Sequence, residues 1–88
     1  MKADHGQVSQ SLRTARGQID GILRMVEDDR YCVDISNQLL ATEALLRKTN
    51  KIVLEAHLQS CVRESFETGA DVDQKIREIL RLVEKIIK

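Results

Sequence analysis

The sequence has no proline, no tryptophan and only two aromatic residues, one tyrosine and one phenylalanine. Without proline, nothing forces a long helix to break. With so few aromatic rings, we do not expect a platform that stacks the bases of single strands or RNA. The 14 basic and 14 acidic residues cancel, so the net charge gives no general attraction to nucleic acid.

Long apolar runs are also missing. No stretch approaches the roughly eighteen apolar residues of a membrane span, and residues 1–5 lack the apolar stretch of a signal peptide. These absences predict a cytoplasmic protein with no membrane contact. In that reducing compartment the two cysteines are expected as metal ligands, thiol sensors or core residues rather than as a disulfide.

The length and the apolar pattern predict a single all-α domain over residues 1–88. At 88 residues a single core is marginal, so we expect several copies to associate. The first helix, about 7–28, has apolar residues spaced alternately by four and three on one face: Val8, Leu12, Ala15, Ile19, Ile22 and Val26. The acidic run 27–29 opposes the dipole at a helix end and suits the start of the next helix, so we place a break there.

The second helix, about 32–66, is the long central one. Its apolar residues cover more than one face, as expected for a helix packed on two sides at the centre of an oligomer. Gly69 can end it. Asp71 followed by Gln74 resembles a capping box and starts a third amphipathic helix at about 72–87.

Cys32, His57 and Cys61 form the most informative group in the chain. Taken one at a time, each is more often an ordinary residue, because free cysteine is commonly buried as a small hydrophobe. Together they are three soft or borderline metal donors. His57 and Cys61 are four residues apart, so on a helix they lie one turn apart on the same face.

Cys32 precedes His57 by 25 residues, which along one helix is roughly 37 Å. A second chain closes that gap. Two antiparallel copies with a two-fold axis near Leu45 and Leu46 place Cys32 of one copy opposite the His57–Cys61 turn of the other. The sequence therefore predicts an antiparallel dimer with two equivalent sites between subunits.

The donor set favours trigonal Cu(I). A structural zinc site normally has a fourth protein donor, and octahedral nickel or cobalt takes more nitrogen and oxygen ligands. His5 is the only other imidazole, and we expect it to belong to a mobile N-terminal tail rather than to provide a fourth ligand.

The segment RGQIDGILRMVEDDRYCVDISNQL, followed by NKIVLEAHLQSC, resembles the CsoR/RcnR family of bacterial metal- and stress-sensing repressors. The resemblance covers almost the whole chain, and the Cys, His, Cys combination is that of the family's copper(I)-responsive branch. It implies helical dimers of the four-helix-bundle type that pair into tetramers, bind operator double-stranded DNA when metal-free and release it when Cu(I) binds. It also implies that Cys32 of one protomer, with His57 and Cys61 of the other, holds the copper.

The resemblance assigns further roles. Tyr31 and Glu78 would surround the ligands, and a carboxylate that accepts the second N–H of a bound imidazole would link copper to the third helix. The first two helices would provide a flat DNA-binding surface, with phosphate contacts from Arg13, Arg16, Lys48 and Lys51. A basic group such as 47–51 is typically only a solvated helix face. Many members also carry basic residues where this chain has Gln7, Gln10 and Ser11, so we expect either a modest DNA affinity or different operator contacts.

Two other functions remain open. A repressor on the same family plan could sense persulfide, other thiol stress or another metal. A purely thiol-based sensor would use the two cysteines without needing His57. A copper-buffering protein would bind Cu(I) but not DNA. An enzyme is not expected, since His57 and Cys61 lack a third orienting group and an oxyanion loop.

Overall fold

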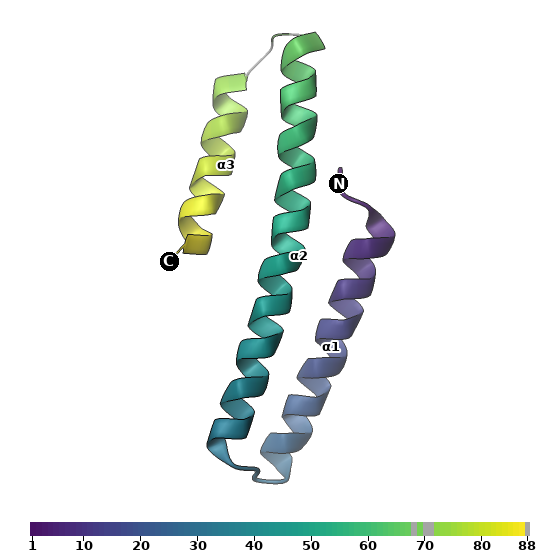
Figure 1. Ribbon diagram of the computed structural model, residues 1–88, viewed down its shortest axis with the longest axis vertical. Helices are drawn as coiled ribbons and strands as arrows, with labels where there is room; N and C mark the ends of the chain where they lie inside the picture. Colours follow the sequence, from purple (N-terminus) through teal and green to yellow (C-terminus); the bar gives the residue numbers. More distant parts are fainter. Residues whose placement is uncertain (68, 70–71, 88) are drawn as a thin grey trace. The chain divides into compact units, whose positions relative to one another are not determined.

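The computed structural model describes residues 1–67, 69 and 72–87. Three helices follow one another: α1 (His5–Glu27), α2 (Cys32–Glu67) and α3 (Val72–Ile87) (Figure 1). The predicted all-α class and long central helix are confirmed, and each observed helix end lies within two residues of its predicted position. Asp71, predicted to cap the third helix, lies outside the described residues.

The chain divides into two compact units that share α2. We call Asp4–Asn50 the N-terminal hairpin, and Met1–Ala3 together with Lys51–Lys88 the C-terminal unit. The hairpin contains α1 and the first half of α2, and the C-terminal unit contains the second half of α2 and α3. The single domain expected from the sequence remains a prediction.

Asp4 caps the start of α1. Its Oδ1 accepts hydrogen bonds from the backbone N–H of Gly6 at 2.8 Å and of Gln7 at 3.4 Å, which satisfies two of the donors that a helix start leaves without partners. The helix therefore begins at His5. The prediction that His5 belongs to the tail is wrong, because this cap extends the helix two residues further than the apolar pattern indicates.

The end of α1 is a Schellman motif. Asp29 has a positive φ of 53°, a conformation that short polar side chains tolerate. Its N–H donates to the carbonyl of Val26 at 3.1 Å, and the N–H of Arg30 donates to the carbonyl of Met25 at 2.9 Å. This confirms the break predicted from the acidic run. Beyond α2, Gly69 has a φ of 66°, the left-handed conformation that a glycine adopts without strain.

The N-terminal hairpin has a narrow core. Val8, Ala15 and Ile22, at intervals of seven on α1, are buried, as are Thr42 and Thr49 on α2. The two threonine hydroxyls are satisfied: that of Thr42 donates to Gln18 Oε1 on α1 at 2.8 Å, and that of Thr49 to the carbonyl of Leu45 at 2.8 Å. A hydrogen bond therefore joins the two helices within the core, where an unpaired hydroxyl would destabilise the fold.

Half of the predicted apolar stripe of α1 is uncovered in the single chain. Leu12, Ile19 and Val26 are 46–57% exposed, and Leu39 and Leu46 on α2 are 42–53% exposed. Apolar side chains left exposed along one stripe of a helix are typical of an interface with another chain. The exposed half of the stripe supports the association expected from the chain length.

In the C-terminal unit, α3 runs antiparallel to the second half of α2 (Figure 1). Ile79 of α3 and Cys61 of α2 are buried, and Ala3 of the N-terminal segment is also buried. Lys75 of α3 forms an ion pair with Glu64 of α2. Within the described part of the chain, none of the helices has the length and apolar character needed to cross a bilayer.

Candidate metal centre

His57 and Cys61 place two metal donors side by side on one turn of α2. The Nε2 atom of His57 and the Sγ atom of Cys61 are 3.6 Å apart, and which of them donates the hydrogen bond depends on the histidine tautomer. Two donors bound to one ion at roughly 2.3 Å for sulfur and roughly 2.0 Å for nitrogen, with a trigonal angle between them, lie about 3.7 Å apart. The pair thus has nearly the spacing that a shared ion requires.

The two donors differ in exposure. The side chain of Cys61 is only 6% exposed, whereas His57 is exposed. Since α3 packs on this half of α2 and its Ile79 is also buried, Cys61 belongs to the small core of the C-terminal unit. The imidazole is therefore open to a second molecule, while the thiol beside it is shielded.

The third predicted ligand is not part of this pair. Cys32 is the first residue of α2, belongs to the N-terminal hairpin and is exposed. Among the described residues of the single chain, no three His, Cys, Asp or Glu side chains gather in a way that could hold a metal ion. One chain therefore supplies two adjacent donors and one exposed thiol.

The ion pair between Glu64 and Lys75 shows the register of α2 against α3. Glu64 follows Cys61 by three residues, so it shares a helix face with the donors. The hydrogen bond from Lys75 and then its positive charge lower the pKa of Glu64, with smaller effects from Lys2 and His57, while desolvation opposes them. Neither Glu64 nor Lys75 was predicted from the sequence, although the spacing of Glu64 from His57 and Cys61 marks it as a residue of the donor face.

This register locates Glu78. Because the helices are antiparallel, three steps forward from Lys75 on α3 match three steps back from Glu64 on α2, so Glu78 lies at the level of Cys61. Glu78 also shares a side of α3 with Lys75, three residues earlier, and is exposed. The carboxylate of Glu78 therefore lies at the same level along the two helices as the donor pair.

Tyr31 and the four predicted DNA contacts all lie on the surface. Tyr31 precedes α2 and is 69% exposed. Arg13 and Arg16 on α1 and Lys48 on α2 are exposed in the N-terminal hairpin, and Lys51 is exposed in the C-terminal unit. Lys51 has Glu55 within 3.8 Å, and the neighbouring Arg47 pairs with Glu43 at 2.7 Å. The basic group on α2 is thus partly neutralised by its own helix.

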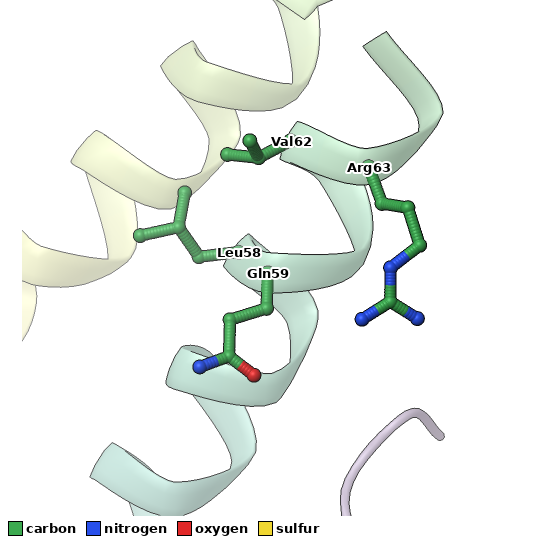
Figure 2. Close-up of a pocket in the computed structure, with 4 residues that line it drawn as sticks. All are labelled: Leu58, Gln59, Val62 and Arg63. Atoms are coloured by element: carbon green, nitrogen blue, oxygen red, sulfur yellow. The ribbon is translucent and has the colours of Figure 1, made fainter. Parts of the chain in front are cut away.

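The residues around Cys61 point to two sides of α2. Figure 2 shows Leu58 and Val62 turned toward α3, whereas Arg63 extends from the opposite side of the helix. Together with Gln59 they line an open hollow of about 660 Å³. The apolar side of this turn supports α3, and the polar side faces away from it.

The family model described as "Metal-sensitive transcriptional repressor" matches residues 4–85 of the chain. Among individual proteins, the chain is 50% identical over 68 residues to the copper-sensing transcriptional repressor CsoR of Mycobacterium ulcerans. That match covers 74% of the chain and 58% of the relative.

Two further relatives are covered more fully. The chain is 39% identical to the copper-sensing transcriptional repressor CsoR of Bacillus subtilis, over 93% of the chain and 80% of the relative. It is 35% identical to the copper-sensing transcriptional repressor RicR of Mycobacterium tuberculosis, over 100% of the chain and 99% of the relative.

Two solved structures share the fold. The Cu(I)-bound copper-sensing repressor CsoR of Geobacillus thermodenitrificans superposes with a TM-score of 0.84 at 34% identity, covering 94% of this chain and 85% of that one. The nickel-responsive regulator InrS superposes with a TM-score of 0.82, covering 97% and 94% of the two chains. At 20% identity the second match shows the fold alone.

We expect substitution of Lys75 by Gln to expose the buried thiol. Without the ion pair to Glu64, α3 opens more often, and Cys61 should react roughly two- to fivefold faster with a thiol reagent, the range expected for a partly exposed pair. Exposed Cys32 serves as the internal reference, and Lys85→Gln, near the end of α3, is the matched control. An unchanged Cys61 rate in Lys75→Gln would contradict this role of the pair.

Proposed function

Because the chain belongs to the family of metal-sensitive transcriptional repressors, which are not enzymes, we propose that it is a copper(I)-responsive repressor. It binds operator DNA when metal-free and releases it when Cu(I) occupies a Cys–His–Cys site between two subunits. The observation that carries this proposal is the 3.6 Å separation of His57 Nε2 and Cys61 Sγ on one turn of α2.

The donors support copper over the other metals. Two thiolates and one imidazole suit the soft Cu(I) ion, and three protein ligands are one fewer than a structural zinc site takes. CsoR of Bacillus subtilis and RicR of Mycobacterium tuberculosis are named for copper sensing, and one similar structure contains Cu(I). Cys32 of one subunit and His57 with Cys61 of its partner are the proposed ligands.

Association of two copies would complete the site. Cys32 is exposed at one end of α2 and His57 is exposed in its second half, so an antiparallel pair of α2 helices presents each residue to the other copy. The uncovered apolar residues of α1 and α2 supply the surface for this pairing. An isologous dimer of this kind forms two equal sites, and pairing of dimers would give the tetramer that we propose.

Release of DNA would depend on α3 and on the residues around the site. Bound copper would supply one positive charge shared by three donors. The imidazole of His57 then has one N–H left to donate, and the Glu78 carboxylate at the level of Cys61 is placed to accept it. Tyr31 would adjoin the same site through Cys32. Through Glu78 the state of the site is passed to α3, which biases the assembly toward a form that does not fit DNA.

DNA would be bound through phosphate contacts. Arg13, Arg16 and Lys48 have no ion-pair partner in the described part of the chain, so they keep their full charge for the DNA backbone. Lys51 would join them, with its charge partly offset by Glu55. None of these residues is expected to read bases.

The proposal is tested by titrating the reduced protein with Cu(I) while following its binding to the DNA upstream of its own gene. We expect Cu(I) to weaken DNA binding at least tenfold, as for a typical allosteric coupling, and Zn(II) and Ni(II) to have little effect. His57→Ala should remove the copper response and leave metal-free binding intact.

Other outcomes would contradict the copper repressor. Release by polysulfide but not by Cu(I) would indicate the thiol-stress sensor, which the free Cys32 and Cys61 thiols would also permit. Tight Cu(I) binding without any DNA binding, at low as well as high salt, would indicate a copper-buffering protein.

A second experiment separates copper binding from its consequence. Glu78→Gln should leave the Cu(I) affinity within about twofold while reducing copper-driven DNA release roughly five- to tenfold, because the amide accepts a weaker hydrogen bond from the imidazole than the carboxylate does. The control is Glu84→Gln, an exposed carboxylate two turns further along α3. Equal release by both variants would reject the role of Glu78.

A further inference from the structure

The N-terminal segment is held where it joins α1. Ala3 is 6% exposed and is grouped with the second half of α2 in the C-terminal unit. The next residue, Asp4, is held by its hydrogen bonds to the start of α1. Chain termini are ordered only where such contacts tie them down. Lys2, next to the buried Ala3, is therefore held against α2.

Lys2 and one side of α2 enclose a polar hollow of about 240 Å³. Its lining consists of Lys2, Ala56, Gln59, Ser60 and Arg63. Four of these five side chains carry hydrogen-bond donors, two of them are cationic and none is a carboxylate. The fifth is the small Ala56, which leaves the space between the donors open. Arg63 extends from the side of α2 that faces away from α3 (Figure 2).

The positive charge of this hollow is offset only in part. The nearby carboxylate of Glu64 is lowered in pKa chiefly by Lys75, with Lys2 a smaller cause. Arg63 has no ion pair with any residue that the structure describes. An arginine fork, an ammonium, an amide and a hydroxyl that converge on one space suit an oxyanion, since charged hydrogen bonds to phosphate are the strong ones.

We propose that this hollow binds a phosphate of the DNA backbone, so that the N-terminal segment and the outer side of α2 belong to the DNA-binding surface. The inference rests on the proposed function, which supplies DNA as the partner. Arg63 takes the phosphate through its guanidinium, Lys2 adds a second positive charge, and Ser60 and Gln59 donate from the helix. The contact lies within two turns of His57 and Cys61, so DNA and copper use the same stretch of α2.

The test compares the metal-free protein with Arg63→Gln in titrations of a fluorescent duplex at several salt concentrations. Loss of one phosphate contact per hollow should weaken binding roughly three- to tenfold and reduce the slope of log affinity against log salt by about one for each hollow engaged. Lys2→Gln should act in the same direction. Arg81→Gln removes the same charge from an exposed position on α3 and should bind like the wild type.

The outcomes separate this inference from the proposed function. If the wild type binds DNA and Arg63→Gln matches it in affinity and slope, the hollow is not a phosphate site on DNA, even if inorganic phosphate alone shifts the backbone amide NMR signals of Gln59 and Ser60. If Arg63→Gln weakens binding but Cu(I) does not release the DNA, the inference stands and the copper repressor fails. A wild type that binds no DNA overturns both.

Discussion

The functional account depends on one short contact, in which the imidazole of His57 and the thiol of Cys61 meet at 3.6 Å on one turn of α2. Helical geometry makes this pair almost unavoidable once both residues stand four apart on a continuous helix. The same helix keeps Cys32 in a different unit of the chain. A site with three protein donors therefore requires another copy, and the structure leaves apolar surface on α1 and α2 for that copy to cover.

The donor pair lies next to α3 within the C-terminal unit. Cys61 lies in the core that α3 completes, and the Glu64–Lys75 ion pair sets which residues of α3 stand at the level of the donors. Metal binding at His57 and Cys61 would therefore occur beside α3, which packs against the buried Cys61. The same stretch of α2 also borders the polar hollow lined by Lys2 and Arg63. One segment of helix thereby serves a metal and, in our proposal, a nucleic acid.

Much of this architecture could be predicted from the sequence. The absence of proline, the apolar residues of the first helix spaced alternately by four and three, the acidic run before Tyr31 and Gly69 were enough to place three helices within two residues of their ends. The closeness of His57 to Cys61 followed from their spacing alone. These features are local, so the helix period determines them.

Features that depend on packing between distant segments were not predictable in this way. Ala3 as a buried anchor and Lys2 beside Arg63 require the N-terminal segment to lie against α2, which no periodicity indicates. The cap at Asp4 is local, but the apolar pattern does not mark it. The Glu64–Lys75 pair depends on the register between α2 and α3. Sequence patterns specify which face of a helix is apolar, but the partner of a surface charge is decided by tertiary packing.

The central claim is that the copper site is shared between subunits, and mixing two inactive variants tests it most directly. Cys32→Ser and Cys61→Ser each lack a ligand in every site of their own dimers. After subunit exchange, half of the dimers are mixed and each has one intact site, so about a quarter of the wild-type number of competitor-resistant Cu(I) sites should return. If the mixture recovers no sites beyond those of the separate variants, the shared site is contradicted.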